Sequence, residues 1–301
     1  MSARQLMSTK EVADYLRLKE RKIYDMVANA EIPHSRVSGK LLFPLTLVDE
    51  WVRQSTAGAV LHLQRKAPPV IAGSSDPLLE WAVRESRCGL ATMTYGSMDG
   101  IDRMVATTAC AAAMHIPTPP GARGAPSDDR NVALFRDRLA HLDCVLLEWA
   151  KREQGLVVAV GNPLKIGKLV DLKKPKVRVI LRQPGAGSYL LFLQLLGQAG
   201  VNPDQLKYAQ PSAQTEFDIA SAILDGRADV GLAVHAVARQ FHLDFIPLTV
   251  ERLDIAVLRP SYFDAPWQAL MQFTQKTTFL RYAKTLAGYD IRDLGKVIWN
   301  A

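Results

Sequence analysis

From Val70 onward, short apolar runs alternate with longer stretches of helical character, and this alternation restricts the fold more than any other feature of the sequence. The runs have the length and the β-branched content of buried strands, whereas the stretches between them are long enough for helices. Strands that alternate with helices are typical of α/β folds with largely parallel sheets. The sequence therefore predicts an α/β fold for most of the chain.

The individual elements follow from the same pattern. The expected strands are Val70–Ala72, Leu90–Met93, Val145–Leu147, Leu156–Val160, Val177–Leu181, Val230–Val234, Phe245–Leu248 and Ile255–Leu258. The expected helices are Pro77–Arg87, Gly100–His115, Tyr189–Gln198, Thr215–Asp225 and Trp267–Ala287. The stretch 116–130 is rich in proline and glycine and is expected to be a mobile loop.

The first part of the chain follows a different pattern, which predicts a small helix-turn-helix unit with a hairpin wing. Ser8 and Glu11 form a capping box at the start of a first helix, and a second helical pattern begins at Lys19. Ser38-Gly39 is a turn signal between two short apolar-bearing runs, and a third helical pattern covers Leu45–Arg53. The order helix, turn, helix, hairpin, helix is that of a winged helix.

Positive charge is concentrated in this first part. Residues 1–66 hold 11 Lys/Arg and 7 Asp/Glu, so more than half of the chain's net charge of +7 lies in its first fifth. Cationic groups at the start of a helix and at the tip of a hairpin can neutralise phosphates and release counterions. We therefore expect this unit to bind double-stranded DNA, although ordinary solvated helix charges would produce the same composition.

Part of the unit resembles the excisionase/MerR-type helix-turn-helix domain. The matching residues are Ser8-Thr-Lys-Glu-Val-Ala-Asp-Tyr-Leu16, Tyr24, Ile32-Pro33, Gly39-Lys40 and Trp51. In that family the second helix enters the major groove and the hairpin wing touches phosphates. The resemblance implies that the DNA-contacting residues here are Lys19, Arg21, Lys22 and Tyr24 on the helix and Arg36 and Lys40 on the wing.

The sequence departs from this family at two positions beside the second helix. Lys19 stands where a small hydroxyl residue is common, and Ala30 stands where glycine is common. Both changes weaken the capping of the helix and leave its DNA-facing residues unchanged.

Three expected strand-to-helix junctions in the larger part combine glycine with serine. They are Gly73-Ser-Ser-Asp76, Gly96-Ser97 and Gly185-Ala-Gly-Ser188. Helix N-termini present free amides and partial positive charge, glycine lets a ligand approach the backbone, and serine adds a hydroxyl donor. Three such corners would form a site for an anion or a small polar ligand if they converge at one edge of a sheet. A single corner of this kind is also ordinary turn chemistry.

Enzymatic chemistry has no complete motif in the sequence. Gly161-Asn-Pro-Leu-Lys-Ile-Gly-Lys-Leu169 differs from a P-loop in its spacing and has leucine where Ser or Thr should hold magnesium. Glu148 and Glu251 could act as paired acids, but nothing in the sequence brings them together. We therefore expect no catalytic residues, no cofactor and no resident metal.

The cysteines and the lengths of the apolar runs indicate the cellular compartment of the protein. Cys88, Cys110 and Cys144 are an odd number of widely spaced residues without zinc-finger spacing, which favours a reducing cytoplasm over a disulfide framework. No run of 18 apolar residues exists, and the first residues lack an apolar signal core. The sequence predicts a cytoplasmic protein without a membrane span.

The larger part resembles the periplasmic-binding-protein-like domain that is fused to helix-turn-helix modules in bacterial and archaeal regulators. The matching stretches are Gly73–Leu79, Gln154–Pro163, Arg182–Ser188, Gly226–Leu232 and Leu243–Leu248 with Glu251. The resemblance implies a type II fold of two α/β lobes joined by two crossing strands, with the ligand between the lobes.

The same resemblance implies the domain bounds. Residues 1–54 would be the winged helix-turn-helix domain, 55–67 a linker and 68–301 the ligand-sensing domain. Lobe one would comprise about 68–150 and 245–301, and lobe two about 151–244. The crossing strands would lie near Glu148–Val158 and Leu243–Leu253.

The resemblance extends to molybdate- and tungstate-binding proteins, which hold a tetrahedral dianion with hydroxyls and amides at helix N-termini. The corresponding residues here are Ser74, Ser75, Ser97, Gly187 and Ser188, with Arg182 as an added cation. The sequence departs from the family at His115-Ile-Pro-Thr-Pro-Pro and at Gly185-Ala-Gly-Ser-Tyr189. An oxyanion such as molybdate or tungstate is the expected ligand, and its identity stays open.

Together these features predict a one-component transcriptional regulator. The winged helix would bind an operator as part of a homodimer, because one such module buries too little DNA surface for tight binding. The large domain would bind a small anionic or polar ligand. Two alternatives remain: a large domain that serves only dimerisation or protein recruitment, which predicts no ligand-dependent thermal stabilisation, and an enzyme that uses the cleft.

Overall fold

The computed structural model describes residues 6–55, 66–116 and 130–300. The chain divides into two compact units, Met1–Lys66 and Ala67–Ala301, which are treated separately below as the N-terminal and C-terminal units. The expected linker 55–67 and the expected loop 116–130 fall largely on 56–65 and 117–129, outside the described residues.

The N-terminal unit is the expected winged helix. Its elements are β1 (Leu6–Met7), α1 (Thr9–Leu16), α2 (Glu20–Ala28), β2 (Ser35–Val37), β3 (Lys40–Pro44) and α3 (Leu45–Ser55). The short strand β1, which the sequence analysis missed, pairs with β3, so the wing is a three-stranded sheet in the order β1-β3-β2. The helices pack on this sheet around a small core that includes Val12, Ile23, Phe43 and Val48.

Local side-chain chemistry explains these boundaries. The Ser8 amide donates to the Glu11 carboxylate over 2.7 Å, and the Glu11 amide donates to the Ser8 hydroxyl, which completes the expected capping box. Ser38 and Gly39 have φ of 49° and 83° and join β2 to β3. Positive φ at both central residues matches the twist of the flanking strands, and glycine adopts it without strain.

The C-terminal unit is an α/β structure with one mixed sheet. Its strands are β4 (Val70–Gly73), β5 (Ala91–Met93), β6 (Ala111–Met114), β7 (Cys144–Val158), β8 (Arg178–Ile180), β9 (Lys207–Tyr208), β10 (Val230–Val234), β11 (Asp244–Leu258), β12 (Tyr289–Asp290) and β13 (Val297–Asn300). Its helices are α4 (Pro77–Ser86), α5 (Ser97–Val105), α6 (Arg130–Arg138), α7 (Gly187–Gln198), α8 (Glu216–Leu224), α9 (His235–Gln240), α10 (Arg259–Tyr262), α11 (Ala265–Thr274) and α12 (Thr277–Thr285), with 3-10 turns at Leu169–Lys173 and Pro203–Gln205.

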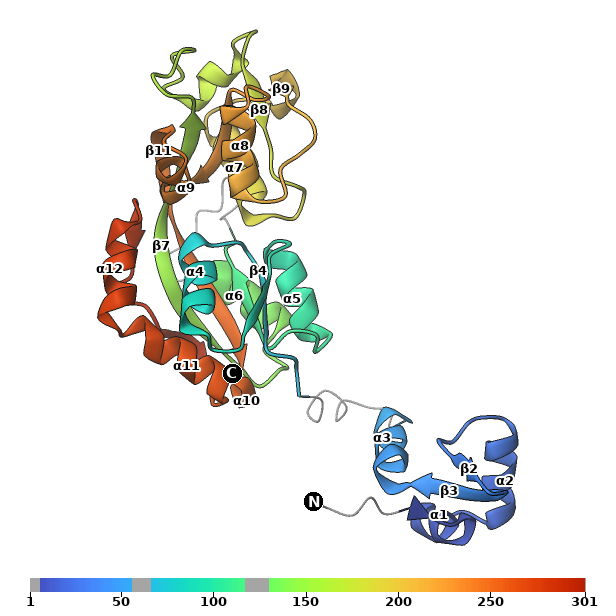
Figure 1. Cartoon of the computed structure of the whole chain (residues 1–301). Helices are drawn as coiled ribbons and strands as arrows, with labels where there is room; N and C mark the ends of the chain where they lie inside the picture. The colour runs from blue at the N-terminus through green and yellow to red at the C-terminus, as the bar shows by residue number, and fades with distance from the viewer. Residues whose placement is uncertain (1–5, 56–65, 117–129, 301) are drawn as a thin grey trace. The chain divides into compact units, whose positions relative to one another are not determined.

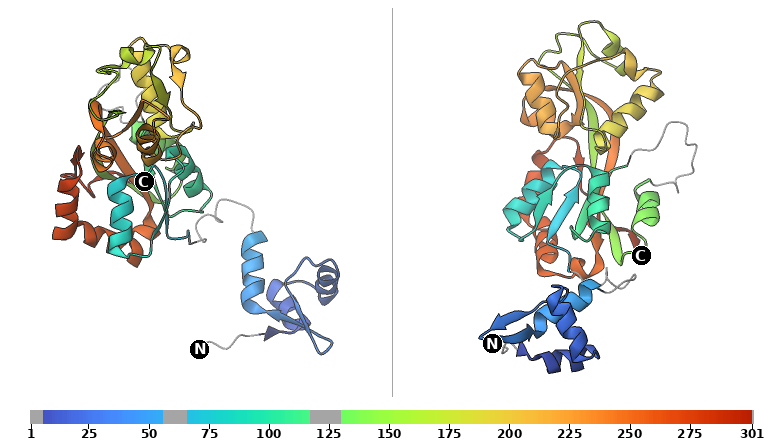
Figure 2. Two further views of the ribbon diagram at one scale, coloured as in Figure 1. Left: turned by 45° about the horizontal axis from the view of Figure 1, so that its top comes forward. Right: turned by 90° about the vertical axis from the view of Figure 1, so that its right-hand side faces the viewer.

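The sheet order β5-β4-β6-β11-β7-β10-β8-β9 divides this unit into two lobes (Figures 1 and 2). β4, β5 and β6 are parallel and form lobe one, whereas β8, β9 and β10 are parallel and form lobe two. β7 and β11 run through both lobes, and these two 15-residue strands pair antiparallel along their whole length. The expected two-lobed α/β architecture with two crossing strands is confirmed.

Several expected elements were wrong in their bounds. The expected helix Gly100–His115 is α5 followed by β6, because the helix-forming run Ala111–Met114 is a fully buried strand between β4 and β11. Tertiary pairing overrides local helix propensity there. The expected helix Trp267–Ala287 is two helices, α11 and α12, separated at Gln275-Lys276 after the buried Thr274, whose hydroxyl donates to the Met271 carbonyl.

Ala30 provides a test of how the second helix ends. Ala30 has φ of +55°, and the Glu31 amide donates to the Met26 carbonyl, which is the hydrogen bond of a Schellman cap. Because glycine adopts this conformation without the Cβ clash, Ala30→Gly should stabilise the N-terminal unit by about 1 kcal/mol. Urea unfolding of a fragment spanning residues 1–66 measures this free energy.

The matched control is Ala28→Gly, at the last residue of α2. Glycine inside the helix costs conformational entropy, so this variant should lose about 0.5–1 kcal/mol. Equal changes in both variants would contradict the proposed cap geometry.

Candidate functional site

The predicted corners of the C-terminal unit meet at one cavity between the lobes. It is lined by Ser74, Ser75, Gly96, His115, Arg152, Arg182, Ala186, Gly187, Ser188 and Glu216. Its volume is about 10 Å³, which is room for roughly one water molecule. A tetrahedral oxyanion is larger, so the lobes must move apart to admit one.

The lobe-one wall is held together by close backbone packing. Gly73 lies so near β6 that an added Cβ would stand 2.2 Å from the Ala113 carbonyl oxygen. Gly100 of α5 packs directly on Gly73, where a Cβ would approach its Cα to 2.6 Å. The Ser74 amide donates to Ala113, so the corner after β4 lies against the end of β6.

Ser97 lies behind this wall and not on it. Its side chain is fully buried, and its hydroxyl lies 2.7 Å from the Ser74 hydroxyl. The same oxygen donates to the His115 carbonyl over 3.0 Å and accepts from the His115 amide over 3.2 Å. Ser97 therefore positions Ser74 and His115, while the other five predicted ligand-binding residues line the cavity.

The lobe-two wall is the start of α7 together with Arg182. Ala186 caps this helix without a side-chain hydrogen bond, so the first amides, from Gly187 onward, have no capping acceptor from a side chain. Arg182 donates through Nε to the Gln183 side chain and through Nη2 to the Gln214 carbonyl. Its Nη1 has no hydrogen bond among the residues that the structure describes. Amides and guanidinium together make this wall electropositive.

The two walls touch beside the cavity through glycine. An added Cβ at Gly187 would stand 2.7 Å from the His115 carbonyl oxygen, and one at Gly96 would stand 2.9 Å from the Gly185 carbonyl oxygen. The Gln183 side chain also donates through Nε2 to the Tyr95 carbonyl across the gap over 3.4 Å. The absence of side chains at these glycines allows the lobes to close on each other.

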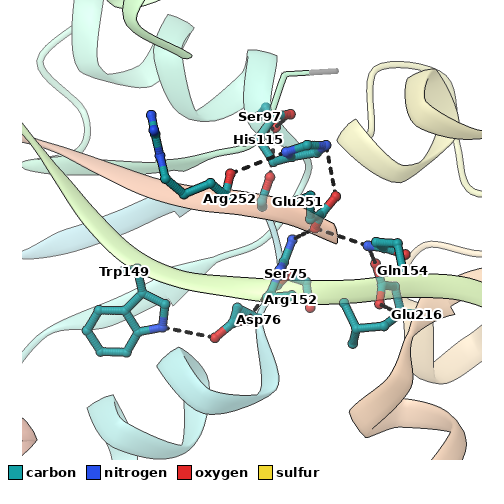
Figure 3. Close-up of polar contacts among 12 residues, drawn as sticks. Ser75, Asp76, Ser97, His115, Trp149, Arg152, Gln154, Glu216, Glu251 and Arg252 are labelled. Atoms are coloured by element: carbon teal, nitrogen blue, oxygen red, sulfur yellow. Dashed lines mark hydrogen bonds and ion pairs between the residues drawn. The ribbon is translucent and has the colours of Figure 1, made fainter. Parts of the chain in front are cut away.

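Arg152 of β7 occupies the floor of the cavity and is almost completely buried (Figure 3). Its Nη1 lies 3.0 Å from the Asp76 carboxylate at the start of α4, and its Nη2 pairs with Glu251 of β11. Burial alone disfavours its charged form, but Glu251 and Asp76 outweigh burial and raise the pKa of Arg152 well above its ordinary value. Its Nε is buried and has no hydrogen-bond partner in the part of the chain that the structure describes.

Asp76 connects this ion pair to several other elements. One carboxylate oxygen accepts from the Leu79 amide, which caps α4, and from the Trp149 indole over 3.1 Å. The other accepts from Arg152 and, over 2.5 Å, from the Tyr289 hydroxyl of β12. Burial, followed by the nearby Asp76 charge, raises the pKa of Tyr289, so its hydroxyl stays a donor.

Glu251 and Glu216 are two buried acids with different surroundings. Burial would raise the pKa of Glu251, but Arg152 and then His115, whose Nε2 lies 2.8 Å from its Oε2, lower it below the ordinary value. Glu216 accepts from the Val234 amide over 2.9 Å and from the Gln154 side chain over 3.4 Å. Burial raises the pKa of Glu216, and the opposing effects of Arg152 and Arg182 do not reverse it.

Several residues in and beside the cavity were not predicted from the sequence. Arg152 and Glu216 line the cavity and Gln154 donates to Glu216, yet none of these three was identified, and His115 entered only as a departure from the family. Arg152 and Gln154 are two residues apart on β7, so they lie on one face of the strand. The sequence signal that could have identified them is this two-residue spacing of polar side chains within a buried strand. Glu148 and Glu251 do not pair, since the strand register sets Glu251 opposite Arg152.

The N-terminal unit carries the six predicted DNA-contacting residues on its surface. Lys19, Arg21, Lys22 and Tyr24 are exposed at the start of α2, and Arg36 and Lys40 are exposed on the wing. A groove of about 590 Å³ lies between α2 and the wing, with Tyr24, Arg36, Lys40 and also Lys10 along it. Among the described residues, none of these cations forms a recorded ion pair, so their charges are available to a polyanion.

Comparisons with known proteins agree with the division into a helix-turn-helix unit and a two-lobed unit. Residues 80–275 match the family described as PBP superfamily domain, and residues 6–56 match the family described as helix-turn-helix domain. The first match spans more than half of the sequence, so the chain belongs to the PBP superfamily domain family. The protein joins a helix-turn-helix domain to a two-lobed domain of that family.

Two uncharacterized proteins are similar in sequence to parts of this chain. Uncharacterized protein YvgK of Bacillus subtilis (strain 168) is 32% identical over 153 residues, which is 51% of this chain and 49% of that protein. The match thus spans about half the length of YvgK. An uncharacterized protein encoded in the 5′ region of a Clostridium pasteurianum 2Fe-2S ferredoxin gene is 24% identical over 100 residues, covering 33% of this chain and 88% of that protein.

A solved structure shares the fold of the C-terminal unit. The tungstate ABC transporter structure from Geobacter sulfurreducens aligns with a TM-score of 0.50 and 12% identity, over 72% of this chain and 97% of that one. Among the described residues, no helix has the length and apolar content to cross a membrane, and no three His, Cys, Asp or Glu side chains gather as a metal site.

Removal of the Arg152 charge should strongly destabilise the C-terminal unit. Arg152→Met leaves the Asp76 and Glu251 carboxylates buried without their cation, which typically costs about 3–5 kcal/mol. The control is Arg292→Met, whose solvent-exposed pair with Asp290 should contribute little to stability because water and salt screen it. Urea unfolding of both variants of the full chain measures the difference.

The Arg152→Met penalty should also depend on pH. The folded-state pKa of Glu251 is lowered, so its stabilising contribution is present above the ordinary glutamate pKa and is lost as pH falls through the folded value. The penalty should therefore shrink in acid. A penalty that stays constant from neutral pH down to the acid limit of folding would contradict the ion-pair account.

Proposed function

We propose that this protein is a ligand-responsive transcriptional regulator without enzymatic activity. The helix-turn-helix domain binds operator DNA as part of a homodimer in the cytoplasm, and the two-lobed domain senses a small oxyanion, with molybdate and tungstate as first candidates. The observation that carries the proposal is the single cavity at which hydroxyls, helix amides and Arg182 from both lobes converge.

The chemistry of the cavity supports an anionic ligand. The N-terminal amides of α7 have no side-chain cap, and Ser74, Ser75 and Ser188 add hydroxyl groups around the same space. Helix N-termini of this kind bind anions because free amides and the helix dipole act together. The tungstate ABC transporter structure from Geobacter sulfurreducens shares the fold, so an oxyanion of that type is the first probe.

The size of the cavity supports a coupling between binding and lobe movement. A cavity of about 10 Å³ admits an oxyanion only after the lobes separate along β7 and β11, and the ligand then contacts both lobes. A ligand shifts a conformational equilibrium only by its differential affinity for the two states, typically about 1–3 kcal/mol. That range is sufficient to change operator occupancy several-fold.

Removal of serine hydroxyls from the cavity tests the proposed oxyanion binding. Molybdate at about 100-fold excess over its Kd should stabilise the wild-type protein by about 2.7 kcal/mol in a thermal-shift titration. Ser74→Ala combined with Ser188→Ala removes one hydroxyl from each lobe and should abolish that stabilisation. The control is Ser86→Ala combined with Ser221→Ala, since neither residue lines the cavity.

Two results would contradict the proposed oxyanion binding at this cavity. A double variant that still responds like wild type would show that the site lies elsewhere. A wild-type protein with no stabilisation by any oxyanion or small organic acid would instead favour a large domain that serves only dimerisation or recruitment.

The exposed cations test the DNA-binding half. Arg21→Ala and Lys40→Ala should each weaken operator binding and reduce the slope of log K against log salt by about one for each lost phosphate contact. The control is Lys176→Ala, an exposed lysine of the C-terminal unit, which should leave the slope unchanged. Fluorescence anisotropy with operator DNA at several salt concentrations measures these slopes, and wild-type slopes in both variants would refute the assignment.

A further inference from the structure

Among the described residues that line the cavity, Glu216 is the one acid, and the rest of the lining suits an anion. It is the first residue of α8, its exposed fraction is 5%, and both carboxyl oxygens accept hydrogen bonds from N–H groups of lobe two. A buried carboxylate beside a bound dianion would be strongly repelled in so dry a space. The arrangement therefore requires a means of removing one negative charge.

The neighbouring cations do not neutralise the Glu216 carboxylate. The charge of Arg152 is already shared between Asp76 and Glu251, which both pair with it directly. Arg182 then remains as the cation that faces both Glu216 and a ligand. The other titratable groups around the cavity are His115 at the end of β6, Glu80 of α4, which accepts from the Ser75 hydroxyl, and Asp218 of α8, which caps its own helix.

Protonation of Glu216 removes the repulsion and adds a donor. A carboxylic acid has one O–H, and a fully ionised oxyanion has only acceptor oxygens. Burial already raises the pKa of Glu216, and a dianion beside it would raise that pKa further. The remaining carboxyl oxygen can keep its hydrogen bond from the Val234 amide.

We propose that Glu216 enters the ligand complex as a carboxylic acid and donates its hydrogen to an oxygen of a proton-free tetrahedral oxyanion. Occupancy of the cavity by such a dianion takes up one proton from solvent, and no other bond forms or breaks. Glu216 is thereby a specificity-determining residue of the site described above. This inference rests on the proposed function, because it requires an oxyanion at that cavity.

The proposal sets the pH dependence of binding. When Glu216 is ionised in the free protein, each molybdate ion bound must bring one proton with it, so Kd rises up to tenfold for each pH unit above the pKa of Glu216. Molybdate itself stays a dianion at neutral and alkaline pH, so the slope reports on the protein. Isothermal titration calorimetry of the full chain between about pH 6.5 and 9 measures both Kd and the protons taken up.

Glu216→Gln separates this role from general effects of pH. The glutamine amide donates to an oxyanion without a proton and has the same shape, so molybdate binding should persist and the slope should fall to near zero. The control is Glu153→Gln, a half-exposed acid on β7 that pairs with His235 and does not line the cavity, which should keep the wild-type slope. Thermal unfolding of each variant confirms that it folds.

The outcomes distinguish this proposal from the proposed function. Molybdate binding with a flat pH profile in the wild type would overturn the proton uptake and leave oxyanion sensing intact. A wild-type slope retained in Glu216→Gln would place the proton on another group, such as His115, and would overturn the assignment to Glu216. An absence of molybdate binding by the wild type at every pH would overturn the proposed ligand together with this inference.

Discussion

The buried pairing of Arg152 with Asp76 and Glu251 is the interaction on which the two-lobed unit depends. It joins the start of α4 to both long strands, at the point where those strands pass between the lobes. One cation and two carboxylates are tolerable in a dry interior because Arg152 pairs with both acids and because Trp149, Tyr289 and the Leu79 amide also donate to Asp76. The cavity floor is thus fixed by strand register and leaves little room for alternative side chains.

Above that floor, the geometry is set by small residues. Glycines at 96 and 187 let the lobes touch, and glycines at 73 and 100 pack β4, β6 and α5 together within lobe one. The walls are therefore formed largely by backbone, while β7 and β11 connect the lobes. A two-lobed domain of this kind can respond to a ligand mainly by a change in the angle between its lobes. Hinge movements of this kind are one way in which regulators transmit ligand binding to a DNA-binding domain.

The parts of the structure that could be predicted from sequence are those that local chemistry decides. The capping box at Ser8, the turn at Ser38-Gly39 and the Asp76-Pro77 helix start all occur as expected. Long-range pairing decided the rest. Ala111–Met114 is a strand because β4 and β11 flank it, and the expected strands Val145–Leu147 and Leu156–Val160 lie largely in one strand, β7, because the residues between them pair with β11. Ser97 carried the same signal as Ser74, yet only the packing of α5 on β4 shows that it lies behind the wall, and Glu216 reaches the cavity through a helix without any glycine-serine motif.

The hydrogen bond from Tyr289 to Asp76 joins residues 213 positions apart, and it has a consequence for biosynthesis. The N-terminal unit ends at Lys66 and has its own core, so it can fold as soon as it leaves the ribosome. The sensing unit stays incomplete until translation has passed β12, because Asp76 lacks one donor and β7 lacks an edge partner until then. A nascent chain can therefore complete its helix-turn-helix unit well before its two-lobed unit, and a product truncated between them would contain only the first folded unit.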